Sequence, residues 1–228
     1  MKQIILLHGA IGASDQLYSL SLELKSKGYE CFTLDFSGHG SKDFSNGFGI
    51  AAFADELENF IESNNLKQPH VFGYSMGGFV ALYLASRKPN LLGAIITLGT
   101  KFEWSAEIAA KEIKMLDANI ILEKVPKFAE ALQKRHGEKW NLLLQRTAEM
   151  MLELGRSNAL SEKEFAKISN PVFIGLADND TMVSVEETNF ATSKIKNSKR
   201  FELTETKHPI ETVNTNQLTE LIQQFIEA

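Results

Sequence analysis

Residue types that mark several specialised classes of protein are scarce in this sequence. Cys31 is the single cysteine among 228 residues, so no disulfide can form within the chain, and its apolar neighbours indicate a buried strand residue. Lys and Arg number 24 against 29 Asp and Glu, which gives a net charge of −5. Nucleic-acid binding requires clustered positive charge, so we expect no nucleic-acid partner.

Long hydrophobic runs are also missing. No segment approaches the roughly 18–20 apolar residues that a membrane span requires. The first apolar run, Ile4–Leu7, stops at His8 and is shorter than the roughly 7–15 residues at the centre of a signal peptide. We therefore expect a cytoplasmic protein with a small-molecule partner and no membrane span, and we leave its oligomeric state open.

Short apolar, β-branched runs alternate along the chain with helical patterns, which is typical of a parallel sheet covered by helices. The strands are predicted at Ile4–Leu7, Cys31–Asp35, His70–Gly73, Ala94–Leu98, Val172–Leu176 and Arg200–Leu203. The helices between them are predicted at Ser14–Lys27, Ile50–Asn64, from Ser75 onward, Val185–Ile195 and from Pro209 to the C-terminus. The sequence thus predicts one α/β domain with a mainly parallel sheet of about six strands.

One region interrupts this alternation. Residues 101–170 contain no convincing strand, and apolar residues recur there at three- and four-residue spacing in Ala106–Asp117, Ile120–His136 and Lys139–Gly155. We interpret residues 101–170 as a helical lid inserted into a core that consists of residues 1–100 and 171–228.

The strongest motif is Gly73–Gly77, which reads Gly-Tyr-Ser-Met-Gly and joins a predicted strand to a predicted helix. This is the pattern of a nucleophile elbow, in which glycines permit a turn so sharp that the serine is strained and exposed. Ser75 would then stand at the N-terminus of a helix, where free N–H groups stabilise a developing oxyanion. We predict that Ser75 is a nucleophile.

A glycine-rich loop, His8–Gly12, follows the first strand directly. Acyl transfer needs two N–H donors near the oxyanion, and this loop can supply one of them. We predict an oxyanion hole formed by the backbone N–H groups of Ala10 and of Met76, the residue after the nucleophile.

A serine nucleophile needs a histidine base, and the base needs a carboxylate to orient it. Of the five histidines, His39 lies after the second strand and is a competitor, but His208 follows the last strand and precedes Pro209, which is expected to start a helix. We predict His208 as the base. The loop after the preceding strand offers two carboxylates, Asp178 and Asp180, of which one would orient the imidazole and the other would stabilise the turn.

With these motifs the chain resembles the α/β-hydrolase superfamily over essentially its whole length, including Gly38–Gly40 and Asp180–Val183. The resemblance favours Asp180 over Asp178, because members commonly carry Asp-x-x-Val at the acid. The usual first two antiparallel strands do not precede the strand that leads to His8, so the resemblance implies a shortened sheet.

The resemblance implies a serine hydrolase without metal or cofactor that cleaves a small to medium ester, thioester or lactone through an acyl-enzyme intermediate. Phe102 and Trp104 are the aromatic residues expected to face Ser75. A same-fold alternative is a carbon–carbon bond hydrolase or related lyase, whose substrate carboxylate would need a basic residue such as Lys101 or Arg146. An alternative of another class is a non-catalytic small-molecule receptor.

Overall fold

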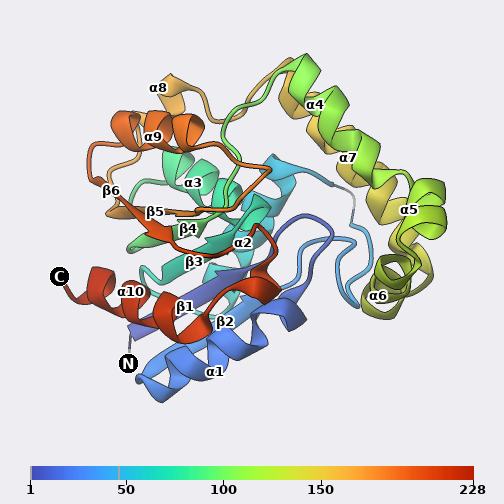
Figure 1. Cartoon of the computed structure of the whole chain (residues 1–228). Helices are drawn as coiled ribbons and strands as arrows, with labels where there is room; N and C mark the ends of the chain where they lie inside the picture. The colour runs from blue at the N-terminus through green and yellow to red at the C-terminus, as the bar shows by residue number, and fades with distance from the viewer. Residues whose placement is uncertain (1, 46) are drawn as a thin grey trace.

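The computed structural model describes residues 2–45 and 47–228, and within them six strands form one sheet in the order β2-β1-β3-β4-β5-β6. Every neighbouring pair is parallel. The predicted shortened parallel sheet of about six strands is therefore confirmed (Figure 1). The strands are β1 (Lys2–Leu7), β2 (Tyr29–Leu34), β3 (His70–Tyr74), β4 (Ile95–Leu98), β5 (Val172–Ala177) and β6 (Ser198–Leu203).

Helices cover both faces of the sheet, as the near-continuous apolar character of the central strands requires. One face packs against α1 (Tyr18–Ser26) and α10 (Thr215–Glu227), with Ile4 and Leu6 of β1 between them. The opposite face, with Ile5 and Leu7, packs against α2 (Ile50–Ser63), α3 (Met76–Arg87) and α9 (Val185–Lys194). Figure 1 shows α1 and α10 together on one side of the strands and α3 and α9 on the other.

The first and last predicted helices differ from the observed ones. The first begins as a 3-10 helix, η1 (Ser14–Leu17), before α1. The prediction that Pro209 starts the C-terminal helix is wrong: its ψ of 129° is extended, and only the short η4 (Ile210–Thr212) follows. The helix α10 begins six residues later, where the side chain of Asn214 accepts a hydrogen bond from the N–H of Gln217.

Between β4 and β5 every regular element among the described residues is helical. These elements are α4 (Ala106–Glu112), η2 (Ile113–Leu116), α5 (Ala118–Lys124), α6 (Pro126–His136), η3 (Gly137–Lys139), α7 (Trp140–Arg156) and α8 (Glu162–Phe165). The predicted helix Ile120–His136 is divided in two, because Pro126 cannot continue α5 and instead occupies the first turn of α6.

We use the term helical insertion for α4 to α7. Figure 1 shows these helices beside the sheet rather than on either of its faces, and a small apolar cluster formed by Ile121, Ala129, Leu132, Trp140 and Leu144 holds α5, α6 and α7 together. The short helix α8 packs instead against α3 and α9. Of the described helices, none combines the length and apolar character needed to cross a membrane.

Candidate active site

Ser75 lies in the turn between β3 and α3 with φ of 50° and ψ of −116°, a backbone conformation that residues other than glycine rarely adopt. The turn is fixed by hydrogen bonds: the Ser75 N–H donates to the Leu98 carbonyl at 2.8 Å, and the Thr100 hydroxyl donates to the Ser75 carbonyl at 3.0 Å. A Cβ at Gly77 would lie 2.5 Å from the Leu7 carbonyl oxygen, so only glycine fits beside β1. The elbow is thus strained and tightly held.

His208 and Asp180 are brought together from the loops that follow β6 and β5. The Nδ1 atom of His208 lies 2.6 Å from Oδ2 of Asp180, and the Asp180 side chain is 1% exposed. The other oxygen of Asp180 accepts hydrogen bonds from the N–H groups of Met182 at 2.8 Å and Val183 at 3.0 Å. This arrangement holds the carboxylate in one orientation and leaves Nε2 of His208 as the nitrogen free to exchange a proton.

The environment of Asp180 favours its charged form. Burial by itself would raise the pKa of this carboxyl, but the hydrogen bond and charge of His208 and the two backbone N–H groups outweigh burial and lower it. Asp180 therefore remains an anion that fixes the Nδ1–H tautomer of His208.

Asp178, the other carboxylate of this loop, has different partners. Its oxygens accept hydrogen bonds from the N–H groups of Thr206 at 3.0 Å and Glu205 at 2.8 Å, and these bonds lower the pKa of its carboxyl. Asp178 thus joins the loop after β5 to the loop that carries His208, without contacting the imidazole.

The two predicted oxyanion donors lie near Ser75. Ala10 and Met76 line the same cavity as Ser75 and His208. Among the described residues, neither the Ala10 N–H nor the Met76 N–H has a hydrogen-bond acceptor, and Met76 is the first residue of α3, where the N–H has no intrahelical partner. Both groups are therefore available to a bound oxyanion.

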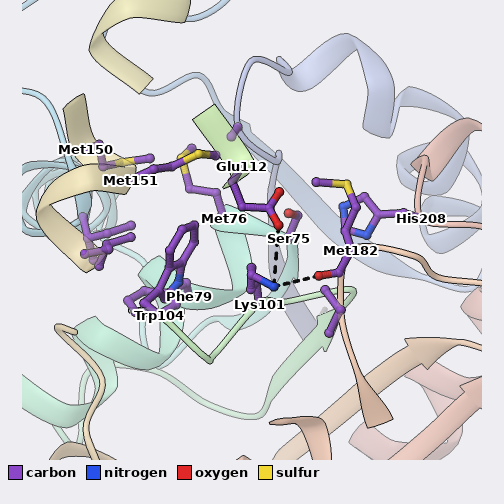
Figure 2. A pocket seen from close by; sticks show the side chains of 14 residues that line it. Ser75, Met76, Phe79, Lys101, Trp104, Glu112, Met150, Met151, Met182 and His208 are labelled. Carbon is purple, nitrogen blue, oxygen red and sulfur yellow. Dashed lines mark hydrogen bonds and ion pairs between the residues drawn. The ribbon is translucent and has the colours of Figure 1, made fainter. Parts of the chain in front are cut away.

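The cavity has a volume of about 50 Å³ and is mostly apolar. Phe79 of the core, Met150 of the helical insertion and Trp104 line it, as Figure 2 shows. Leu154 of the insertion lines it as well. Phe102 does not belong to this cavity, contrary to the expectation from sequence. It is 3% exposed and packs edge-on against Phe165 of α8, so its ring belongs to the core.

Two charged residues, Lys101 and Glu112, also line the cavity (Figure 2). The sequence offers Lys101 as a possible anchor for a substrate carboxylate, whereas none of its motifs includes Glu112. A signal was present: Glu112 lies three residues after Ala109, so both share the buried face of α4. A charged residue at an apolar position of a helix indicates a partner or a function.

The other histidines form hydrogen bonds with the backbone. His8, His39 and His136, which we call the buried histidine cluster, have ring centroids 4.7 Å apart for His8 and His39 and 6.2 Å apart for His39 and His136. His70 accepts from the Ala94 N–H at 3.1 Å near the start of β3. In the part of the chain that the structure describes, no group of three or more His, Cys, Asp or Glu residues could hold a metal ion.

A family model described as the alpha/beta hydrolase fold matches residues 2–158. The solved enol-lactonase of Burkholderia xenovorans LB400 superposes with a TM-score of 0.81 at 16% identity, over 100% of this chain and 92% of that one. At this identity the likeness concerns the fold.

Sequence relatives match over a shorter region. Ethanol acetyltransferase 1 of Hanseniaspora uvarum is 30% identical over 94 residues, which are 40% of this chain and 27% of the relative. A pimeloyl-[acyl-carrier protein] methyl ester esterase of Neisseria meningitidis is 33% identical over 90 residues, which are 40% of this chain and 33% of the relative. The matched segment thus spans a third or less of the length of these curated relatives.

Proposed function

This chain belongs to the alpha/beta hydrolase fold family, and on that basis we propose that it is a serine hydrolase of small to medium esters, thioesters or lactones. Ser75 is the proposed nucleophile, His208 the base and Asp180 the orienting acid. The names of a methyl ester esterase and an enol-lactonase among its relatives and structural neighbours support an ester or lactone substrate.

The observation that carries the proposal is the shared cavity of Ser75 and His208, with Asp180 2.6 Å from Nδ1 of His208. Because Nδ1 is engaged by Asp180, Nε2 takes the proton of Ser75 as its oxygen attacks the acyl carbon. The N–H groups of Ala10 and Met76 stabilise the tetrahedral oxyanion. Nε2 then protonates the leaving alcohol and activates a water molecule that releases the acid from the acyl-enzyme.

We also propose that the helical insertion acts as the lid of the cavity. Met150 and Leu154 of α7 line it together with Phe79 of α3, so both the insertion and the core contribute to its wall. The wall from the insertion would set the size of the group that the enzyme accepts.

Neither alternative from the sequence is favoured by a specific contact. A carbon–carbon bond hydrolase would need a free cation for its substrate carboxylate, but Lys101 is engaged by the Met182 carbonyl at 2.8 Å and by two carboxylates. Arg146 pairs with Glu149 on an exposed face of α7. A pure receptor would have no need of a carboxylate-oriented histidine beside a strained serine.

The test is Ser75→Ala, with Ser19→Ala on an exposed face of α1 as the matched control. We expect Ser75→Ala to lose a factor of about 10⁴–10⁶ in ester turnover and to lose labelling by a fluorophosphonate, with urea unfolding unchanged. The control should keep both. Labelling that persists in the Ser75→Ala protein would show that another residue is the nucleophile.

A further inference from the structure

Glu112, the last residue of α4, is a buried carboxylate directed into the cavity. It is 7% exposed and lines the cavity with Ser75 and His208. Within residues 2–45 and 47–228 its carboxylate accepts no hydrogen bond, and its nearest cationic partner is Nζ of Lys101, at 3.8 Å. Its oxygens are not among the fully buried polar atoms without a partner, so they are open to the cavity, and this long ion pair is their one charged contact among the described residues.

Lys101 balances the charge of Glu112 only in part, because its ammonium is shared among three groups. Nζ donates to the Met182 carbonyl at 2.8 Å and lies 3.7 Å from Oε1 of Glu187. Figure 2 shows the ammonium between Glu112 and Met182 at the edge of the cavity, with the Ser75 side chain directed to the same space.

Glu187, by contrast, is fully satisfied by the backbone. Its Oε2 accepts hydrogen bonds from the N–H groups of Phe102 and Glu103, both at 2.8 Å, and its Oε1 accepts from the Ser184 N–H at 2.8 Å. The group of Lys101, Glu112 and Glu187 therefore carries one positive and two negative charges, and only Glu112 presents its charge to the cavity without a hydrogen-bond donor.

We propose that Glu112 recognises a protonated amine on the substrate, so that the enzyme prefers esters of amino alcohols or amino acids over their hydrocarbon analogues. The inference rests on the proposed function, since it concerns the cavity of Ser75. A cationic N–H supplies the missing donor and balances the extra negative charge, while the apolar walls receive the rest of the substrate. A substrate carboxylate would be repelled by the same group.

A purely structural role makes a different prediction. If Glu112 served only to tether α4 to Lys101, its replacement would weaken folding and lower turnover of every ester by the same factor. If Glu112 recognises the amine, its replacement lowers turnover of the cationic ester more than that of the uncharged ester, so the ratio between matched substrates separates the two roles.

The experiment compares kcat/KM for two isosteric pairs at pH 7. One pair carries the amine in the alcohol, dimethylaminoethyl butanoate against isoamyl butanoate. The other carries it in the acid, methyl dimethylaminobutanoate against the methyl ester of the branched hydrocarbon acid of the same shape. The variants are Glu112→Gln and, as a control of equal charge change on the exposed side of the same helix, Glu107→Gln.

We expect the wild-type protein and Glu107→Gln to prefer the amine in at least one pair by about tenfold or more, the size of one hydrogen bond between charged groups. Glu112→Gln should remove most of that preference, so that the ratio of kcat/KM within the pair falls toward one. Equal rates within both pairs for the wild-type protein, or an equal loss on both members in Glu112→Gln, would overturn the inference while the proposed function stands. Failure to hydrolyse any of the four esters would overturn both.

Discussion

His208 and the buried histidine cluster have opposite environments. His208 has Nδ1 on a carboxylate, and its side chain is 12% exposed and lines the cavity. In the cluster, His8 accepts from the Phe36 N–H at 3.2 Å and contacts the Gly9 carbonyl at 2.8 Å, so both ring nitrogens are bound to the backbone. His39 has Nε2 without a hydrogen-bond partner among the described residues, but it is 0% exposed and does not line the cavity of Ser75, so neither histidine can exchange protons with a substrate there.

The cluster is also held in its neutral form. Nε2 of His8 and Nδ1 of His136 each accept a hydrogen bond from a backbone N–H, so the other nitrogen of each ring must carry the proton. If the accepting nitrogen were also protonated, its N–H would point at the backbone N–H and the hydrogen bond would be lost. Burial lowers the pKa of His8 to about 4 and also lowers the pKa of His39 and His136. The comparison shows that the partners of the two nitrogens, rather than the residue type, determine what a histidine can do.

The largest effect should separate His208 from His39, its competitor in the sequence. We expect His208→Ala to reduce ester turnover by about 10⁴–10⁶ with little change in urea unfolding. His39 is buried between His8, Phe48 and Phe53, so His39→Ala should instead lower the free energy of unfolding by about 2–4 kcal/mol through a cavity. An inactive His39→Ala protein of normal stability would reverse the assignment.

The second prediction concerns the carboxylate that distinguishes His208 from the cluster. Asp180→Asn should lower kcat by about 10⁴, the effect of leaving an imidazole in the wrong tautomer. Asp178→Asn removes acceptors of the Thr206 and Glu205 N–H groups and should cost far less rate, with a small decrease in Tm. The measurement compares both variants at saturating ester, with thermal unfolding as the control. The reverse ranking would make Asp178 the orienting acid.

The third prediction is that acid destabilises the protein through the cluster. Between an unfolded histidine pKa of about 6.5 and the folded pKa of about 4 for His8, the unfolded state binds a proton that the folded state does not. The contribution of the neutral histidines to the free energy of unfolding should therefore be fully present well above about pH 6.5 and should decrease on acidification. From His8 alone the decrease should reach about 3 kcal/mol at pH 4.

Urea midpoints from pH 7 to pH 4.5 measure this loss before the carboxylates contribute. Asp180, whose pKa is lowered, adds its stability above an unfolded pKa of about 3.9 and loses it only at lower pH. Midpoints that do not change between pH 7 and pH 4.5 would contradict the neutral state of the cluster.

The smallest effect should come from His136, which connects α6 to the loop that carries Ala10. Its Nε2 lies 2.9 Å from the carbonyl of Ile11, a residue at φ of 51°. His136→Phe should cost about 1–3 kcal/mol and lower kcat a few-fold by releasing this loop. His70→Phe removes a similar bond at the far end of β3, so it should affect stability without affecting kcat. Equal effects on kcat would show that the loop does not depend on His136.

The sequence by itself determined the layout of the fold. Apolar β-branched runs such as Ile4–Leu7 alternate with helical periodicity, and the six-stranded parallel sheet follows, because the pattern and the burial of each strand arise from the same residues. The turn at Gly73–Gly77 could also be located from sequence, since the steric demand for glycine is local. The start of the C-terminal helix was predicted wrongly at Pro209, because a helix begins where its cap is and Asn214 supplies that cap further along the chain.

Only the tertiary structure decided which side chains meet across loops. Asp178 and Asp180 differ by two positions, yet one contacts the backbone near Thr206 and the other contacts His208. Trp104 lines the cavity from the loop after β4, and Glu112 lines it from the end of α4. Such contacts depend on the approach of segments that are distant in sequence, and neither periodicity nor spacing encodes that approach.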